Sequence, residues 1–200
     1  MFDNIQADIR QARKINAGPG WANQYIKVFI QPVTIAVVLY RLGRSIKRCP
    51  IPILRHGLYA FSALVRFFFE VVTGIVISPG AEIGPGFVVH TPFGVFVGPT
   101  KIGANCVVQH GVVISYGVRG VGDNVFFGPG AKVIGNARIG NNVVVMANSV
   151  VVTDVPDNMT VAGVPVRIRL PRGSTLKFRE CAQRGNGDEA KVGKSLTSKV

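Results

Sequence analysis

The chain has 200 residues, which suits one domain of ordinary size or one domain with an appendage. Apolar residues make up 48% and charged residues 16%, which excludes a disordered chain, and the 24 glycines and 12 prolines follow no Gly-X-Y period, which excludes collagen. The 23 basic residues outnumber the 10 acidic ones, so the net charge is +13.

The basic residues are concentrated at the two ends of the chain. Residues 1–76 hold ten Lys and Arg against three Asp and Glu (net +7), residues 77–170 hold six against four (net +2), and residues 171–200 hold seven against three (net +4). Basic ends suit a membrane surface, phosphorylated ligands or plain solvation. No basic run is interleaved with stacking aromatics, so we expect no nucleic-acid partner.

The cysteine pattern and the first 25 residues bear on the cellular compartment of the protein. Cys49, Cys106 and Cys181 are an odd number and lie far apart, which predicts neither a disulfide framework nor a zinc site and favours a reducing environment. The first 25 residues contain no apolar run of the kind found in secretory signals. We therefore expect a cytoplasmic protein.

Two stretches of the N-terminal region are strongly apolar, residues 28–40 and residues 58–77. The first is too short to span a bilayer. The second contains Arg66 and Glu70, which are four residues apart and would pair on one face of a helix. We expect amphipathic or buried helices rather than membrane spans. The basic residues between the two stretches leave open a helix that lies peripherally on a membrane.

From Ile77 onward the sequence repeats every six residues, over thirteen units across 77–156 with one extra residue placed before Phe96 and one before Val121. Position five is mostly small or β-branched, although Phe93 falls there, and position two is often glycine. Position one is aliphatic or Phe in every unit: Ile77, Ile83, Val89, Phe96, Ile102, Val108, Ile114, Val121, Phe127, Val133, Ile139, Val145 and Val151.

This period predicts a parallel β-helix. A helix would need apolar residues every 3.6 positions and a plain strand every second position. Units of six suit short strands joined by tight turns, with position one inside, position five at a corner, and Gly or Asn in the turns. Three units close a triangular coil, so thirteen units make a little over four coils. We expect helices in 1–76 to cap a β-helix in 77–170, followed by a flexible polar tail in 171–200.

Four segments resemble the serine acetyltransferase branch of the hexapeptide-repeat acyltransferases, and the resemblance covers about residues 1–170. They are the opening residues 2–10 (FDNIQADIR), residues 77–84 at the start of the repeat (ISPGAEIG), residues 128–136 in the late coils (GPGAKVIGN), and the exit residues 148–151, 155–156 and 162–167 (NSVV, VP and AGVPVR).

The resemblance implies a mainly β fold in which a left-handed parallel β-helix follows an α-helical region and assembles as a homotrimer. It also implies an acetyl-CoA-dependent O-acetyltransferase that needs no metal and binds acetyl-CoA in the groove between two subunits. Gly128, Pro129 and Ala147 fall where the family lines that groove. Lys132 and Arg167 are candidates for contacts with the CoA phosphates, or else for surface residues.

The family uses a histidine to take the proton of the acceptor hydroxyl, which then attacks the thioester. Of the three histidines here, we expect His56 to be a surface residue of the helical region. His90 and His110 stand in hexads three units apart, which puts them on the same side of consecutive coils. We predict that these two lie next to each other, face outward and are catalytic. The alternative is that they only decorate a solvent face.

Several acceptor-site residues of the family are replaced. Aligned on Gly94, the family's Asp-His pair falls on His90 and Thr91, and an upstream Asp falls on Val76. A long loop with a second His-Pro is reduced to residues 115–120. Short relatives that modify sugars of exported polysaccharides carry histidines where both candidates stand.

Three functions therefore stay open. The acceptor is L-serine, giving O-acetylserine for cysteine biosynthesis, or it is a sugar hydroxyl in polysaccharide or exopolysaccharide biosynthesis. The third function is a non-catalytic trimeric scaffold that binds partners or a membrane through its N-terminal region.

Overall fold

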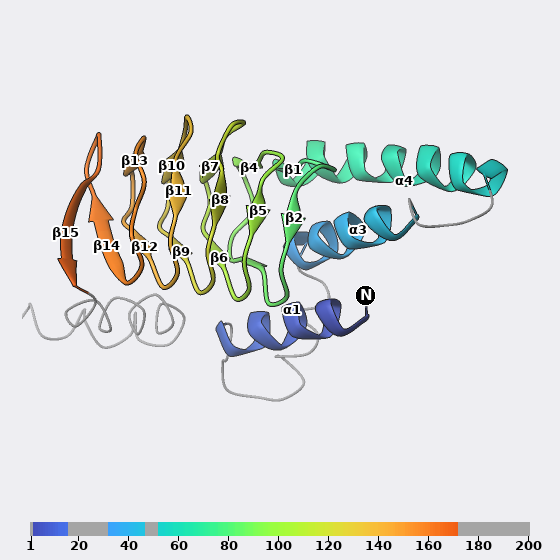
Figure 1. Cartoon of the computed structure of the whole chain (residues 1–200). Coiled ribbons are helices and arrows are strands. Elements are labelled where there is room, and N and C mark those ends of the chain that lie inside the picture. The colour runs from blue at the N-terminus through green and yellow to red at the C-terminus, as the bar shows by residue number, and fades with distance from the viewer. Residues whose placement is uncertain (1, 16–31, 47–51, 172–200) are drawn as a thin grey trace, which may run out of the picture.

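The computed structural model describes residues 2–15, 32–46 and 52–171, where three helices precede a series of short strands (Figure 1). Residues 172–200 of the expected tail, residues 28–31 of the first apolar stretch, Cys49 and Cys181 lie outside these ranges. The helices are α1 (Phe2–Ile15), α3 (Pro32–Ile46) and α4 (Pro52–Thr73). The strands are β1 (Ile75–Ile77), β2 (Glu82–Ile83), β3 (Val88–Val89), β4 (Val95–Val97), β5 (Lys101–Ile102), β6 (Val107–Val108), β7 (Val113–Ile114), β8 (Gly120–Val121), β9 (Phe126–Phe127), β10 (Lys132–Val133), β11 (Arg138–Ile139), β12 (Val144–Val145), β13 (Val150–Val151), β14 (Met159–Ala162) and β15 (Arg167–Pro171).

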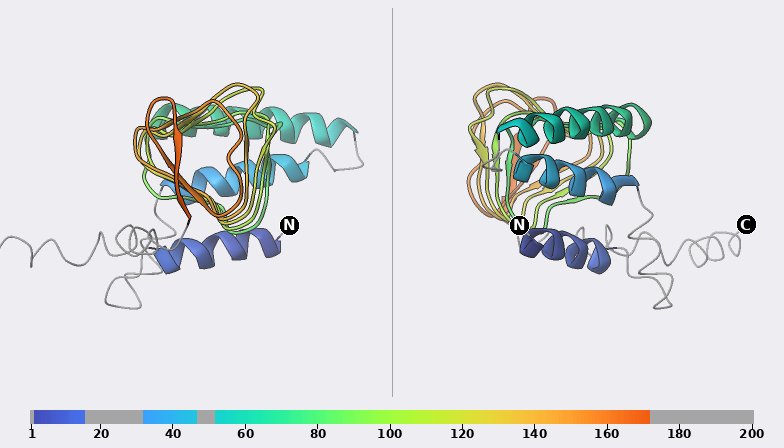
Figure 2. Two further views of the ribbon diagram at one scale, coloured as in Figure 1. Left: turned by 60° about the vertical axis from the view of Figure 1, so that its left-hand side comes forward. Right: turned by 90° about the vertical axis from the view of Figure 1, so that its right-hand side faces the viewer.

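The strands form the three faces of a parallel β-helix. Sheet A contains β1, β4, β7, β10 and β13, sheet B contains β2, β5, β8 and β11, and sheet C contains β3, β6, β9, β12, β14 and β15. The named pairs are parallel, except that β15 returns antiparallel to β14. Seen obliquely along the coil, the faces enclose a triangular interior (Figure 2). The predicted parallel β-helix behind a helical region is confirmed.

The turn residues explain why the chain can bend at each corner. Asn105, Asn124, Asn142 and Asn148 all have positive φ angles of 55–57°. Asparagine tolerates this left-handed conformation better than most residues, because its short side chain can hydrogen-bond locally. The predicted role of Asn in the turns is confirmed.

The interior holds the side chains of positions one and five. Ile114, Phe127 and Val133 at position one are fully buried, and so are Ala131 and Ser149 at position five. Burying an aliphatic or Phe side chain stabilises the fold by roughly 1.5–3 kcal/mol. Because every coil adds such residues to the same core, the repeat itself supplies most of the stability.

The predicted frame is wrong at the fourth unit. Ile77 pairs with Val97 rather than with Phe96, and Val97 in turn pairs with Ile114. Val97 is buried, whereas Phe96 points outward and packs on Tyr116 with 5.5 Å between the ring centroids. Phe93 is therefore not an interior residue either, and it is exposed in a turn at a φ of 77°.

The helices close the first coil. Val33 and Val37 of α3 belong to the same buried cluster as Ile75, and Tyr40 donates a hydrogen bond from its hydroxyl to the carbonyl of Ala81 at 2.6 Å. In Figure 1, α1 lies along the first coils and α4 lies on the opposite side of α3. The N-terminal region therefore covers an otherwise open end of the solenoid, as such folds require.

The second apolar stretch forms most of α4. Arg66 and Glu70 pair at 3.3 Å as predicted. In the part of the chain that the structure describes, no helix is both long enough and apolar enough to cross a bilayer.

Replacing Gly122 by alanine is expected to destabilise the β-helix by about 1–3 kcal/mol, the usual effect of overpacking. A Cβ at this position would lie 2.7 Å from the backbone carbonyl of Gly140 in the next coil, which cannot move away without breaking the coil. The free energy of unfolding from urea titration checks this. Gly43→Ala in α3 is the matched control, since its Cβ would meet nothing within 4 Å and alanine favours a helix. Equal stability of the two variants would contradict the expectation.

Candidate active site

The predicted site residues lie along one corner of the β-helix, where the chain passes from sheet C to sheet A. His90 follows β3, His110 follows β6, Pro129 follows β9 and Ala147 follows β12, so each consecutive coil contributes one residue. Backbone hydrogen bonds connect the coils at this corner: the amide of Gly130 donates to the carbonyl of His110 at 2.9 Å, and the amide of Asn148 donates to that of Pro129 at 2.8 Å. We call this row the corner column.

His110 is held by a residue of the preceding coil. Its Nδ1 lies 3.0 Å from the Oγ1 of Thr91, and its backbone amide donates to the same oxygen at 3.2 Å. In the tautomer that carries a hydrogen on Nδ1, this nitrogen donates to Thr91 and Nε2 is left as the basic nitrogen. The ring itself is exposed. The arrangement suits a general base that faces a ligand outside the coil.

His90 has a different environment. It is half-buried, and its Nδ1 is buried without a hydrogen-bond partner among the described residues. Burial, together with the nearby charge of His110, lowers the pKa of His90 below its ordinary value of 6.5. His90 therefore stays neutral at pH 7. Strand β3 pairs with β6, so the two histidines that follow them lie on neighbouring coils as predicted, while His56 is exposed in α4, as expected for a surface residue.

The candidate cofactor residues continue the corner column away from the helices. A Cβ on Gly128 would lie 2.6 Å from the amide nitrogen of Ala147, so glycine is required where these two coils meet. Lys132 is exposed on β10, where it pairs with Val150 of β13. Arg167 opens β15 and is exposed. The structure thus brings Gly128 and Ala147 together on adjacent coils, while the two cations lie exposed on β10 and β15.

The sequence pattern missed Thr91 as a site residue. Thr91 and His110 are 19 residues apart, and their contact exists only because one coil lies directly on the next. The sequence could have indicated this contact through the length of one coil, which is about three hexads. In such a coil each residue lies next to the residue roughly 18–20 positions later. Among the described residues, no three His, Cys, Asp or Glu side chains gather closely enough to hold a metal ion.

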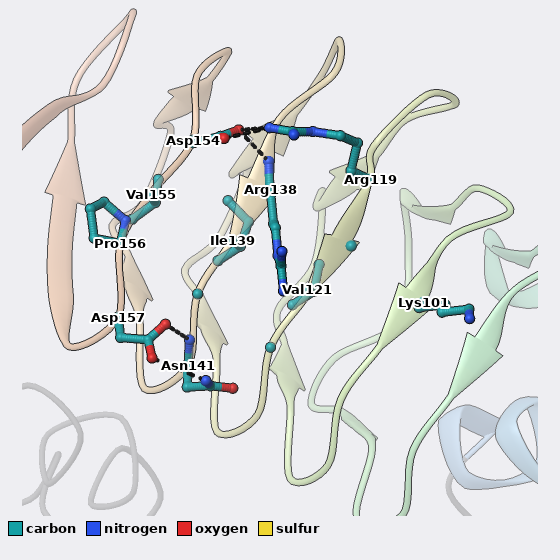
Figure 3. A pocket seen from close by; sticks show the side chains of 13 residues that line it. Lys101, Arg119, Val121, Arg138, Ile139, Asn141, Asp154, Val155, Pro156 and Asp157 are labelled. Carbon is teal, nitrogen blue, oxygen red and sulfur yellow. Dashed lines mark hydrogen bonds and ion pairs between the residues drawn. The ribbon is translucent and has the colours of Figure 1, made fainter.

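A hollow of about 590 Å³ lies on sheet B, away from the histidines (Figure 3). It forms where Gly120 adds no side chain between Lys101 and Arg138 on neighbouring strands. Arg119 at its edge donates two hydrogen bonds to the carboxylate of Asp154. This hollow is separate from the corner column, and its charged groups are largely paired with one another.

Comparison with known proteins agrees with the geometry. The family model of the bacterial transferase hexapeptide (six repeats) matches residues 120–153. A serine acetyltransferase of Synechococcus elongatus is 31% identical over 208 residues, which cover 100% of this chain and 81% of that protein. Serine acetyltransferases of Staphylococcus aureus are 43% identical over 117 residues, 54% of this chain, and this match spans only 53% of their length.

Two solved structures show the same fold. The serine acetyltransferase of Neisseria gonorrhoeae in complex with serine has a TM-score of 0.66 and 28% identity, covering 82% of this chain and 67% of that one. The serine acetyltransferase of Brucella abortus in complex with coenzyme A has a TM-score of 0.68 and 26% identity, covering 85% of this chain and 68% of that one.

A parallel β-helix of hexapeptide units with histidines at one corner defines a hexapeptide-repeat acyltransferase. The full-length match shows more: this chain belongs to the serine acetyltransferase family. Its β-helix is left-handed, as the sequence resemblance implied.

Proposed function

We propose that the chain transfers the acetyl group of acetyl-CoA to the hydroxyl of L-serine, releasing CoA and O-acetyl-L-serine for cysteine biosynthesis. The names of the relatives support the reaction, and the serine and CoA complexes of two of them support the substrates. Within the chain, the observation that carries the proposal is the contact of His110 with Thr91 at the start of the corner column.

His110 serves as the general base in this proposal. Its Nε2 accepts the proton of the serine hydroxyl as the hydroxyl oxygen forms a bond to the thioester carbonyl carbon. The bond from carbon to sulfur then breaks, and the CoA sulfur takes the proton back from the imidazolium. Thr91 is the positioning residue, because it fixes the ring through Nδ1. His90, which stays neutral, offers the acceptor a hydrogen bond without repelling the imidazolium.

Acetyl-CoA would lie along the corner column. From His110 to Ala147 the column advances by two coils, about 10 Å at the usual strand spacing. Pro129 lies midway along the column, and the exposed Lys132 and Arg167 would supply positive charge for the phosphates. The residues 77–170 would thus carry the transferase, with 1–76 as its cap.

The homotrimer expected from the family has physical support in the outward side chains. The outer rows of the two sheets that meet at the corner column are mostly apolar: Val76, Phe96, Val113 and Val150 on sheet A, where Lys132 is the exception, and Val107 and Phe126 on sheet C. Sheet B instead presents Glu82, Lys101 and Arg138. We propose that sheets A and C face neighbouring subunits while sheet B faces water. Light scattering on the purified chain would give the mass of three chains.

L-serine is favoured over a sugar acceptor because the named relatives are serine acetyltransferases. The scaffold alternative has no comparable support. The replacement of the family's acidic residues by His90 and Val76 leads us to expect a raised KM for serine rather than a lost reaction. The cytoplasmic location stays a prediction.

The test is CoA release from acetyl-CoA by the purified full chain, followed with a thiol reagent. Release that depends on L-serine, with O-acetylserine identified by mass spectrometry, is the expected result. Release only with sugars or nucleotide sugars would overturn the acceptor. No release with any acceptor would overturn the transferase itself, and binding of acetyl-CoA by calorimetry would then show whether the corner column binds it.

A further inference from the structure

Helix α4 turns its apolar side to the solvent. Five large side chains on it, Phe61, Leu64, Phe67, Phe68 and Val71, are each 64–69% exposed. With Leu58 and Val72, also exposed, they form a surface that we call the α4 apolar face. No part of the described chain packs on it, and in both views of Figure 2 α4 lies on the side of α3 that faces away from α1. Monomeric soluble proteins rarely leave a contiguous apolar patch of this kind open.

The polar residues of α4 lie on its other side. Arg66 and Glu70 pair with each other and line small clefts with Leu39 and Tyr40 of α3. Between residues 57 and 73 these two are the only charged residues of the helix. A surface helix of a soluble protein normally faces its core with apolar residues and water with charges. In α4 the charged residues face α3 and the large apolar residues face the solvent. The outer side of α4 is therefore suited to contact an apolar environment.

The charge around α4 decides between a second copy of the chain and a lipid surface. Lys47, Arg48 and Arg55 form a basic segment in the sequence at the start of α4, and no acidic residue occurs between residues 9 and 69. Two copies joined through α4 would bring two such segments together and repel each other. An anionic bilayer attracts the same segment.

The helix is suited to lie in a bilayer surface rather than to cross it. Its 22 residues are about 33 Å long at 1.5 Å per residue, but the pair of Arg66 and Glu70 lies within its C-terminal half. An amphipathic helix with an aromatic and leucine-rich side and neighbouring cations binds in the plane of the headgroups. Its exposed half has Phe and Leu at spacings of three and four, so one side can sink among the acyl chains along its length.

We propose that the α4 apolar face binds the surface of an anionic lipid bilayer, with Phe61, Leu64 and Phe68 inserted at the boundary of headgroups and acyl chains. The basic residues Lys47, Arg48 and Arg55 provide the attraction to the anionic headgroups. The protein is then a peripheral membrane protein whose β-helix stays in water. This inference does not depend on which acceptor the enzyme acetylates.

The test is flotation of the full chain with vesicles of phosphatidylcholine alone or with about 30% phosphatidylglycerol. Binding to the anionic vesicles that weakens with rising salt is the expected result, and Phe61→Ser/Phe68→Ser is expected to weaken it about tenfold or more, because two inserted side chains are lost. The control Ile134→Ser/Val152→Ser changes two exposed apolar residues of the β-helix and should bind as the unaltered chain does. Circular dichroism would verify that both variants are folded.

Three results would overturn the proposal. The unaltered chain does not float with anionic vesicles, or the α4 variant floats as well as the control does. Alternatively, light scattering shows that the α4 variant halves the mass of the unaltered chain, in which case a second copy covers the face. None of these results bears on acetyl transfer, which is measured separately without vesicles.

Discussion

Replacing His110 by alanine is expected to lower kcat for acetyl transfer by about 10²–10⁴-fold, the usual contribution of a general base. The reason is geometric, since His110 is the exposed histidine and Thr91 holds its Nδ1 at 3.0 Å. Steady-state release of CoA with L-serine measures the effect, and the affinity for acetyl-CoA should change little. His90→Ala is the matched comparison and should lose less. A larger loss in His90→Ala than in His110→Ala would assign the base to His90.

Substitutions of Thr91 test whether this residue positions the ring of His110 or only stabilises the fold. Thr91→Val removes the oxygen that holds His110 but keeps the shape of the side chain, so kcat should fall about tenfold, the value of one hydrogen bond. The variant Thr91→Ser keeps the hydroxyl oxygen and should therefore retain most of the kcat of the unaltered chain. A fall in stability with an unchanged kcat would show that the threonine has only a structural role.

Replacing Arg41 by alanine is expected to destabilise the fold by about 3–5 kcal/mol, the typical effect of leaving a buried charge unpaired. Arg41 of α3 binds the carboxylate of Asp8 in α1 at 2.5 Å and 3.0 Å and donates to the carbonyls of Ile83 and Gly84 in the first coil. Asp8 also accepts a hydrogen bond from the amide of Phe87 at 2.9 Å. One buried ion pair therefore joins both helices to the β-helix.

The electrostatics explain why removing one partner is worse than removing both. Burial raises the pKa of Asp8, and the guanidinium of Arg41 opposes that rise. Without Arg41 the carboxyl is left buried with no counter-charge. The double variant Asp8→Leu/Arg41→Met should therefore be more stable than Arg41→Ala, because apolar side chains of similar size need no pairing. Urea denaturation measures both, and a loss below about 1 kcal/mol in Arg41→Ala would contradict the expectation.

The two histidines show which features of the site the hexapeptide period predicts and which depend on contacts between coils. Their spacing of three hexads predicted that they lie on consecutive coils, because the hexapeptide period converts sequence distance into position on a face. The same period did not identify which histidine is hydrogen-bonded through its ring or which has a lowered pKa. Those properties depend on Thr91 in the coil before and on burial at the corner, neither of which the repeat encodes.

The frame error at Phe96 has a similar cause. Val95, Phe96 and Val97 are all apolar, so the residues themselves allow more than one interior position. The choice is made by pairing with β1 on one side and β7 on the other, which turns Val95 and Val97 inward. Only neighbouring coils can set that register, since a shift of one residue would exchange the two sides of the strand.

The sequence by itself therefore determined the parallel β-helix, its helical cap, its turns and the corner where the histidines meet, because all of these follow from a short period repeated many times. The tertiary structure alone decided the partner of His110, the frame around Val97 and the outward direction of the α4 apolar face. Each of these depends on contacts between residues of different coils or helices. For α4 the sequence predicted an amphipathic or buried helix with Arg66 and Glu70 on one side, but packing against α3 decided which side faces outward.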